Sequence, residues 1–423
     1  MEKLRKNKFI SSIMTLMTGS VIAQVISVLV SPLMTRLYTE EQIGEYTLIL
    51  TAVSMFGTVL CARYDQSIVS EPNEHNAYAL VKLSFLITVV LSVIVGIGYT
   101  VYYEFTDSLS ISLWETLFWI ILLLFFTGVG HIITSYNNRF KQYKLMSATH
   151  VGRTIGKEGA LVGFGLLNMG SLGLLISQLL GVSLGLGSQG RSLWKNRDKL
   201  KVAKTEDVIA VARTHIRQPL FSVPASFANS FSYSVINIFV NSLYGTAVLA
   251  HYSMSFRMLG LPLSLISVNV SKAYFQKASR EYDEKGSFCK TFLQTSLILL
   301  AVAVPMVILL VLFAPWAFEV FFGEGWGQAG VYVQYLAPLF GVRLIVGALT
   351  PTMTICNKQN FELIIQGLFV VSGFLIYYLS ANGAAIGAFL IGISALFSAV
   401  YLVFYLVMLK LSFSNKKGEN ANG

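Results

Sequence analysis

The chain has 423 residues, of which 54% are hydrophobic and 12% are charged, and its mean hydropathy is +0.64. Soluble domains carry about 25% charged residues, so this composition excludes a soluble globular protein and indicates an integral membrane protein. The formal net charge is +10, and attraction to an anionic inner leaflet explains it without a nucleic-acid partner.

Apolar blocks of roughly 20 residues follow one another along the chain, and a helix of that length crosses about 30 Å of hydrocarbon. The blocks predict an all-α integral membrane protein with about twelve transmembrane helices. We place these helices at residues 10–34, 43–62, 79–102, 112–134, 147–167, 170–190, 218–243, 246–271, 291–315, 328–352, 361–381 and 384–409.

The basic residues lie in alternate gaps between these blocks. Of the 31 Lys and Arg, 28 lie in or close to these alternate gaps, and the other three are Arg36, Arg257 and Arg343. Because Lys and Arg accumulate in cytoplasmic loops, the pattern predicts a multi-pass protein with both termini in the cytoplasm.

One long polar stretch separates six predicted spans from the next six, which suggests two lobes. The expected organisation is a cytoplasmic tail at 1–9, a six-helix lobe at 10–190, a basic linker at 191–217, a second six-helix lobe at 218–409 and a cytoplasmic tail at 410–423. Apolar residues near helical spacing within the linker predict an amphipathic helix that lies on the inner leaflet.

Two short patterns at a constant spacing of 206 residues support the division into related halves. Each pattern follows an apolar block and starts the next one, so the matches share a place in the topology. The matching residues are Leu37, Tyr38 and Tyr46 in the first half and Leu243, Tyr244 and Tyr252 in the second. An even number of spans in each half makes the repeats parallel, as in alternating-access transporters with a central cavity.

Two arginines inside apolar blocks, Arg257 and Arg343, are the first candidates for a functional site. An Arg at the centre of a membrane helix costs roughly 2.5–3.5 kcal/mol on insertion scales, so it should face a cavity or a partner. Pro338 and Pro351 flank Arg343 and suggest a kinked helix that lines a cavity. The pair predicts a cationic cavity for an anionic substrate, since the planar guanidinium can bind two phosphate oxygens. The alternative is a structural ion pair or snorkelling to the interface.

Further candidates lie near the ends of the first two predicted spans. Arg63 and Asp65 form either an inner vestibule or a solvated helix end. Arg36 follows the first span, and the alternative to a functional role is an ion pair with Glu40 or Glu41 in the loop. The only acidic residues expected within membrane segments are Asp65, Glu158 and Glu362, all near cytoplasmic ends. We nominate Asp65 for coupling to an ion. The scattered histidines and cysteines predict no catalytic residue, no metal site and no cofactor.

Four segments carry a resemblance to a known family. They are TRLYTEEQIGEY (35–46), RYDQSIVSEPNEHNAYALVKLS (63–84), NRFKQYKLMSATHVGRTIGKEG (138–159) and RQPLFSVPASFANSFSYSVINIFVNSLYGTAVLAHYSMSFRMLGLPLSLI (217–266). These segments resemble the polysaccharide-repeat flippases, which export O-antigen and capsule units and belong to the multidrug/oligosaccharidyl-lipid/polysaccharide (MOP) exporter superfamily.

The resemblance implies a V-shaped pair of lobes around a cationic cavity. It implies as substrate an oligosaccharide on undecaprenyl diphosphate, moved from the cytoplasmic to the periplasmic leaflet of the bacterial inner membrane. The residues expected to bind the diphosphate are Arg257, Arg343, Arg63 and Arg36. Arg257 and Arg63 match in kind the lumen arginines of related lipid II flippases, whereas Arg36 lies at the end of its span. Membrane lipids, a polysaccharide polymerase and chain-length machinery are expected partners, and nucleic acid is not.

Other functions remain open from the sequence. A cation-coupled multidrug antiporter of the same fold would need a carboxylate in the middle of the membrane, and the sequence predicts none there. A scaffold without transport would leave Arg257 and Arg343 without a role. A polymerase or ligase would need larger external loops than the short segments at 103–111 and 316–327. Transport, and not catalysis, is therefore the expected activity.

Overall fold

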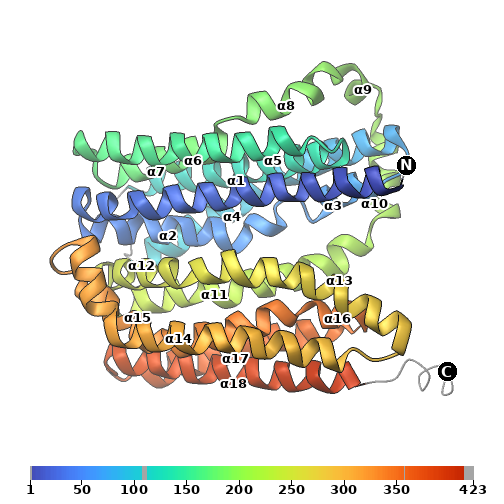
Figure 1. Cartoon of the computed structure of the whole chain (residues 1–423). Coiled ribbons are helices and arrows are strands. Elements are labelled where there is room, and N and C mark those ends of the chain that lie inside the picture. The colour runs from blue at the N-terminus through green and yellow to red at the C-terminus, as the bar shows by residue number, and fades with distance from the viewer. Residues whose placement is uncertain (1, 107–111, 357, 414–423) are drawn as a thin grey trace. The chain divides into compact units, whose positions relative to one another are not determined.

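The computed structural model describes residues 2–106, 112–356 and 358–413, and the regular elements in these ranges are all helices. The predicted all-α membrane fold is confirmed. The chain divides into two compact units, residues 1–242 (unit 1) and 243–423 (unit 2), and Figure 1 colours it from blue at the N-terminus to red at the C-terminus. The cytoplasmic tail expected at 410–423 lies outside the described residues from 414 onward.

The described residues of unit 1 form ten helices and most of an eleventh. They are α1 (Glu2–Leu37), α2 (Glu40–Phe56), α3 (Tyr64–Ser70), α4 (Glu74–Thr106), α5 (Leu113–Arg139), α6 (Tyr143–Leu166), α7 (Gly170–Ser183), α8 (Leu186–Lys195), α9 (Arg197–Val202), α10 (Thr205–Thr214) and α11 (Val223–Tyr244). A short 3₁₀ turn, η1 (Gly57–Val59), follows α2, and a π-helical turn, η2 (Gln218–Ser222), precedes α11. Because α1 already begins at Glu2, residues 2–9 of the expected tail belong to the first helix.

In unit 2, the part of the chain that the structure describes forms seven helices. They are α12 (Thr246–Pro262), α13 (Val268–Lys285), α14 (Cys289–Phe322), α15 (Gly327–Leu349), α16 (Pro351–Ile355), α17 (Gln359–Ser380) and α18 (Ile386–Phe413). A π-helical turn, η3 (Leu263–Ser267), joins α12 to α13. The helix around Arg343 contains Pro338 and gives way to a new helix that begins at Pro351.

Each of the predicted spans coincides with helical residues, but not every one of these helices is long and apolar enough to cross a membrane. In the described part of the chain, eight helices are long and apolar enough to cross a membrane. A ninth candidate is the pair Glu40–Val59 and Tyr64–Ser70, which is bent by 43°. The protein is therefore a multi-pass membrane protein, and the expected number of twelve spans stays a prediction.

The helices at three of the expected spans are not long and apolar enough by this measure: those at 147–167, 218–243 and 246–271. They correspond to α6, α11 and α12. Helix α6 carries four charged residues, Lys144, Arg153, Lys157 and Glu158, and α12 is only 17 residues long. Because α12 continues through η3 into α13, its helical run is still long enough to reach across a bilayer.

The linker at 191–217 forms three short helices, α8, α9 and α10. Helix α10 is amphipathic, as predicted, but its apolar face packs on the protein and not on the membrane surface. Val208 and Val211 are buried in one cluster with Tyr64, Ile68 and Tyr78 of α3 and α4. The apolar face is therefore removed from water by α3 and α4, and the place of α10 relative to the inner leaflet stays a prediction.

Helix α11 groups with unit 1, although its residues were expected in the second lobe. The Asn237 amide donates a hydrogen bond of 3.0 Å to the Thr51 hydroxyl of α2. The rings of Phe227 and Phe56 lie 5.2 Å apart, again between α11 and the end of α2. These contacts explain why the unit boundary lies at the end of α11 and does not precede it.

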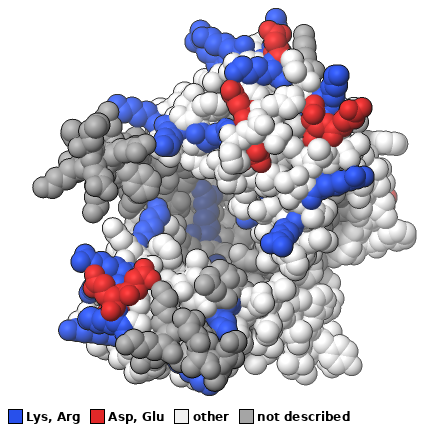
Figure 2. Space-filling view, turned by 90° about the vertical axis from the view of Figure 1, so that its right-hand side faces the viewer, with Lys and Arg blue, Asp and Glu red and all other residues white. Residues whose placement is uncertain are grey.

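Lys and Arg side chains are numerous on the face in Figure 2, which is the right-hand end of the molecule in Figure 1. For unit 1, this end carries the start of α1 together with α3 and α10 (Figure 1). Arg191, Lys195 and Arg197 of the linker are all exposed. This end of unit 1 is the one that the positive-inside pattern predicts to be cytoplasmic.

Candidate functional site

Unit 1 contains a cavity of about 280 Å³ between α5, α6 and α7, which we call the basic pocket. Its lining residues are Phe126, Thr127, Gly130, His131, Thr134, His150, Arg153, Thr154, Lys157, Gln178, Gly181 and Val182. The volume is close to the lower end of the roughly 300–1,000 Å³ typical of ligand pockets. It suits a phosphate-sized group and its immediate neighbours.

Helix α6 supplies most of the polar wall of the pocket. His150, Arg153, Thr154 and Lys157 line it, and their spacing of three, four and seven residues places them on one face of the helix. Because these polar side chains share one helical face and line the same cavity, they can contact a single bound group. The lysine and the arginine make this face cationic.

A break between α7 and α8 holds Arg153 in place. Gly185 has a φ of +75°, a left-handed conformation that glycine adopts at little cost. The helix therefore ends at Ser183, and the Leu184 carbonyl accepts a hydrogen bond from Arg153 Nε. Arg153 Nη2 is buried and has no hydrogen-bond partner among the described residues. A buried, unsatisfied donor is costly, so this nitrogen is suited to an acceptor bound in the pocket.

Helix α7 positions two other pocket residues. The aliphatic stem of Lys157 lies close against Gly181, where a Cβ atom would be 3.0 Å from the Lys157 Cδ atom. The Gln178 amide oxygen accepts a hydrogen bond of 3.0 Å from the Tyr46 hydroxyl of α2. Both contacts limit the rotamers of the pocket side chains and so pre-organise the site.

His131 connects the pocket to two residues predicted from the sequence. Arg63 and Asp65 lie close enough for their charges to act on the His131 ring, although neither lines the pocket. Asp65 is buried, and Arg63 has a left-handed φ of +62° just before α3. The bend between η1 and α3 thus places the predicted pair beside the wall of the basic pocket.

The pocket is positively charged on balance. None of the residues that line it is an Asp or a Glu. Glu158 follows Lys157 directly, but its carboxylate accepts a hydrogen bond of 2.7 Å from the Ser27 hydroxyl of α1 and does not line the pocket. The expectation that Glu158 lies near a helix end is wrong: α6 extends from Tyr143 to Leu166, and Glu158 is only 2% exposed within it.

In unit 2, the structure brings Arg343 next to α12. Its guanidinium carbon lies 5.9 Å from the centre of the Phe256 ring and 5.5 Å from that of Phe340. Phe256 is the residue before Arg257, so the two predicted arginines come from packed, neighbouring helices. Both are half-buried. Cation–π contacts of this kind stabilise a guanidinium by about 0.5–2 kcal/mol.

Arg36 lies apart from the other candidates of unit 1. It is exposed in the last turn of α1. The 17 residues of α2 separate it from Arg63, which is about 26 Å at a rise of 1.5 Å per residue. The structure therefore does not bring Arg36 and Arg63 together in one site.

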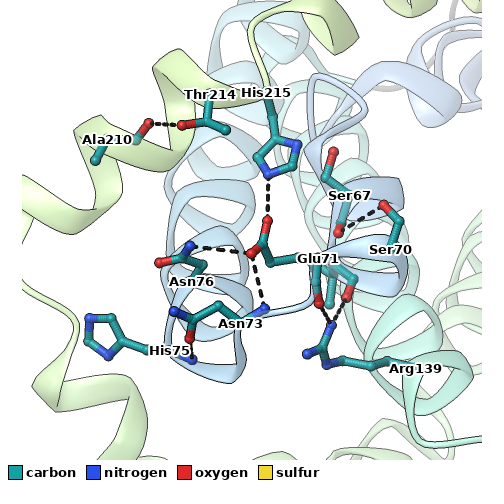
Figure 3. A network of polar contacts seen from close by, with 11 residues as sticks. Ser67, Ser70, Glu71, Asn73, His75, Asn76, Arg139, Ala210, Thr214 and His215 are labelled. Carbon is teal, nitrogen blue, oxygen red and sulfur yellow. Dashed lines mark hydrogen bonds and ion pairs between the residues drawn. The ribbon is translucent and has the colours of Figure 1, made fainter.

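A polar network holds the linker on unit 1 (Figure 3). His215 Nε2 and the Glu71 carboxylate are 2.9 Å apart, and the Glu71 carboxylate also accepts hydrogen bonds from Asn73 and Asn76. Arg139 donates to the carbonyl oxygens of Ile68 and Glu71. Burial alone would raise the pKa of Glu71, but these hydrogen bonds and the charge of His215 lower it overall.

Sequence reasoning missed the basic pocket. The positive-inside pattern assigns Arg153 and Lys157 to the flank of a span, and the histidines, His131 and His150 included, show no regular spacing along the chain. The available signal was the spacing of His150, Arg153 and Lys157 within one apolar block, which predicts a polar helical face. No pattern in the sequence indicates that α7 ends early enough to expose the Leu184 carbonyl.

Comparison with known proteins gives a family and a fold. The model of a family described as polysaccharide biosynthesis protein matches residues 85–330, more than half of the chain. No curated protein matches the sequence.

Several solved structures share the fold at low sequence identity. A lipid II flippase, MurJ, in an inward closed conformation has a TM-score of 0.69 at 14% identity, over 93% of this chain and 89% of that one. An inward-facing multidrug resistance MATE family transporter of the MOP superfamily has a TM-score of 0.62 at 15% identity, over 93% and 96%. A MOP superfamily transporter from Pyrococcus furiosus, described as having a binding pocket of reverse polarity, has a TM-score of 0.59 at 15% identity, over 94% of both chains.

Proposed function

We propose that the chain, which belongs to the polysaccharide biosynthesis protein family, is a flippase and not an enzyme. Its substrate is an undecaprenyl-diphosphate-linked oligosaccharide repeat unit, which it moves from the cytoplasmic to the periplasmic leaflet of the bacterial inner membrane. The product serves the assembly of O-antigen or capsular polysaccharide. Lipid II flippase MurJ, which shares the fold, is named for the transport of a lipid-linked substrate.

The basic pocket is the observation that supports an anionic cargo. It offers Arg153 and Lys157 within a membrane unit, together with the hydroxyls of Thr134 and Thr154, and no carboxylate lines it. A diphosphate brings several acceptor oxygens and negative charge, which such a wall binds through charge-assisted hydrogen bonds. A cationic drug would meet only repulsion there.

The predicted arginines extend this proposal to both units. Arg63 acts beside the basic pocket, and Arg257 and Arg343 bind the diphosphate in unit 2, with Arg36 retained as a weaker candidate. The two units work by alternating access, with the prenyl chain staying in the lipid while the head group crosses a wet path. Outward movement of an anion from a negative interior gains about 2.3 kcal/mol per charge per 100 mV. Asp65 is the residue proposed for coupling to an ion.

A cation-coupled multidrug antiporter is the second candidate, and one observation favours it. Glu158 is a buried carboxylate within α6, hydrogen-bonded to Ser27, so a carboxylate of the kind such a mechanism needs is present. The shared fold with a MATE family transporter is equally consistent with this function. The charge of the basic pocket weighs against it.

The decisive experiment measures undecaprenyl-linked oligosaccharides and surface polysaccharide in cells that lack the protein. We expect complete repeat units to accumulate on the lipid and surface polysaccharide to disappear, with both restored by the wild-type gene. A normal lipid pool combined with altered drug sensitivity would contradict the flippase and support the antiporter.

A further inference from the structure

A second and larger cavity in unit 1 is independent of the basic pocket. It has a volume of about 890 Å³ and lies between α4, α5, α8 and α9; we call it the apolar groove. The lining residues that matter here are Phe85, Gly187, Arg191, Trp194, Lys195 and Arg197. Figure 1 shows α8 and α9 on the outer side of the helices of unit 1.

The lining of the groove combines an apolar floor with basic side chains. The floor comes from α4 and α5, and Arg191, Lys195 and Arg197 come from the linker helices. All three basic residues are exposed, and none forms an ion pair within the ranges that the structure describes. The lining contains no Asp or Glu.

Exposed apolar side chains on α4 begin at the groove and continue along the helix. Phe85, at the groove, is 43% exposed, and Val89 and Val93 continue the same side of α4 at 38% and 40% exposed. Trp194 is 71% exposed, and Arg197 lies 5.8 Å from the centre of its ring. An exposed Trp beside cations is typical of the membrane–water interface, where the ring sits at the level of the head groups.

We propose that the apolar groove binds an anionic phospholipid of the membrane, with its acyl chains against α4 and α5. The phosphate lies among Arg191, Lys195 and Arg197, where its charge is complementary to the lining. The basic side chains near α8 bind the head group, while the wide apolar floor excludes a free phosphate ion as the main occupant. Basic pockets between membrane helices bind anionic head groups in this way. The bound lipid fastens the linker helices α8 and α9 to the body of unit 1.

The test uses the full chain in detergent, titrated with phosphatidylglycerol or phosphatidylcholine and measured by native mass spectrometry. The triple variant Arg191→Gln, Lys195→Gln and Arg197→Gln should bind phosphatidylglycerol roughly 100-fold more weakly. Each basic residue near a lipid surface contributes about fivefold to the affinity, and the three factors multiply. Binding of phosphatidylcholine should change little. A matched control, Lys144→Gln, Arg213→Gln and Arg217→Gln, removes the same charge from exposed positions that do not line the groove.

A steric variant tests the floor without a change of charge. Gly187 lines the groove, and a Cβ atom there meets nothing within 4 Å. Gly187→Leu should therefore fold normally, fill the groove and displace the lipid. Gly98→Leu, at another open position on α4, is the control. Equal binding of both phospholipids by the wild type, equal effects of the two triple variants, or unchanged lipid binding by Gly187→Leu would each overturn the proposal. It would also be overturned if a polyprenyl diphosphate bound at the groove and phosphatidylglycerol did not.

Discussion

Arg153 is the side chain on which the charge and geometry of the basic pocket depend. One end of its guanidinium is fixed by the Leu184 carbonyl, and Nη2 is buried without a partner in the described residues. Hydrogen bonds to charged groups contribute about 1.5–3 kcal/mol each. The loss of such a bond to a substrate diphosphate should therefore reduce transport by about one to two orders of magnitude.

This gives a direct prediction. Arg153→Ala should lower surface polysaccharide roughly tenfold or more at normal protein level, and Arg153→Lys should rescue only part of it, because Lys cannot bind two oxygens in a planar fork. Lys144→Ala removes an exposed cation of the same helix and should have no effect. Quantitative blotting of the protein and of the polysaccharide measures both. Full export by Arg153→Ala would show that the pocket does not bind the cargo.

Arg257 and Arg343 of unit 2 should behave in a similar way but for a different structural reason. Arg343 is held against Phe256 and Phe340, so its position depends on aromatic packing. Alanine at Arg257 or Arg343 should abolish export while the protein remains in the membrane, and Lys should restore it in part. Phe256→Leu should weaken export less than Arg343→Ala. If Arg343→Ala only lowers the amount of folded protein, the residue is structural, and a thermal-stability assay in detergent distinguishes the two results.

At the scale of the elements, close helix packing depends on individual glycines. At Gly330, a Cβ atom would lie 2.5 Å from the Ala314 carbonyl oxygen and 2.5 Å from the Cα atom of Pro315. These are backbone atoms, which cannot rotate away as a side chain can. Gly330→Ala must therefore separate α14 from α15, and overpacking of this kind costs about 1–3 kcal/mol.

Gly330→Ala should lower the melting temperature of the detergent-solubilised protein by several degrees. Gly98→Ala is the matched control, since nothing lies within 4 Å of a Cβ atom there. Equal melting temperatures of the two variants would mean that α14 and α15 adjust without cost.

The elements that the sequence predicts well are those that depend on local pattern alone. Length and hydropathy place a helix at each expected span, and the positions of Leu37 and Tyr244 coincide with the ends of α1 and α11. The amphipathic α10 also follows from periodicity. What the sequence does not predict is the surface that covers its apolar face, because α4 is more than 100 residues away in the chain. The basic pocket escapes prediction for a different reason: α5, α6 and α7 follow one another in the chain, but helical periodicity does not specify how their faces pack together.

The linker gives a prediction about pH. Glu71 has a pKa below its ordinary value of 4.5 in the folded protein, so the unfolded or undocked state binds protons more readily. Its contribution to docking is therefore complete above about pH 4.5 and is lost as the pH falls through the lowered pKa. Hydrogen–deuterium exchange of residues 204–217 should be slow at pH 7, and protection should fall in acid.

The variant Glu71→Gln should show fast exchange of the linker already at pH 7, because the charged partner of His215 is gone. Glu206→Gln, an exposed carboxylate on α10, should leave exchange unchanged. Equal protection in the wild type and Glu71→Gln at pH 7 would show that burial of Val208 and Val211 alone holds the linker.

For the whole molecule, the direction of transport depends on the orientation of the chain in the membrane. The basic linker predicts that residues 191–217 are cytoplasmic, so the far ends of α4 and α14 should reach the periplasm. Three exposed acidic residues report on this arrangement: Glu104 at the end of α4, Asp198 in the linker and Glu324 after α14. Each can be replaced by Cys in a background without Cys61, Cys289 and Cys356.

In intact spheroplasts, a membrane-impermeant maleimide should label Glu104→Cys and Glu324→Cys but not Asp198→Cys, which should react only after lysis. The reverse pattern would place the linker outside and the cargo path in the wrong direction for export, so that the membrane potential would oppose the outward movement of a diphosphate. Labelling of Glu104→Cys without Glu324→Cys would mean that the two units do not share one orientation. Because parallel repeats require an even number of spans in each half, that result would also contradict the twelve-span arrangement.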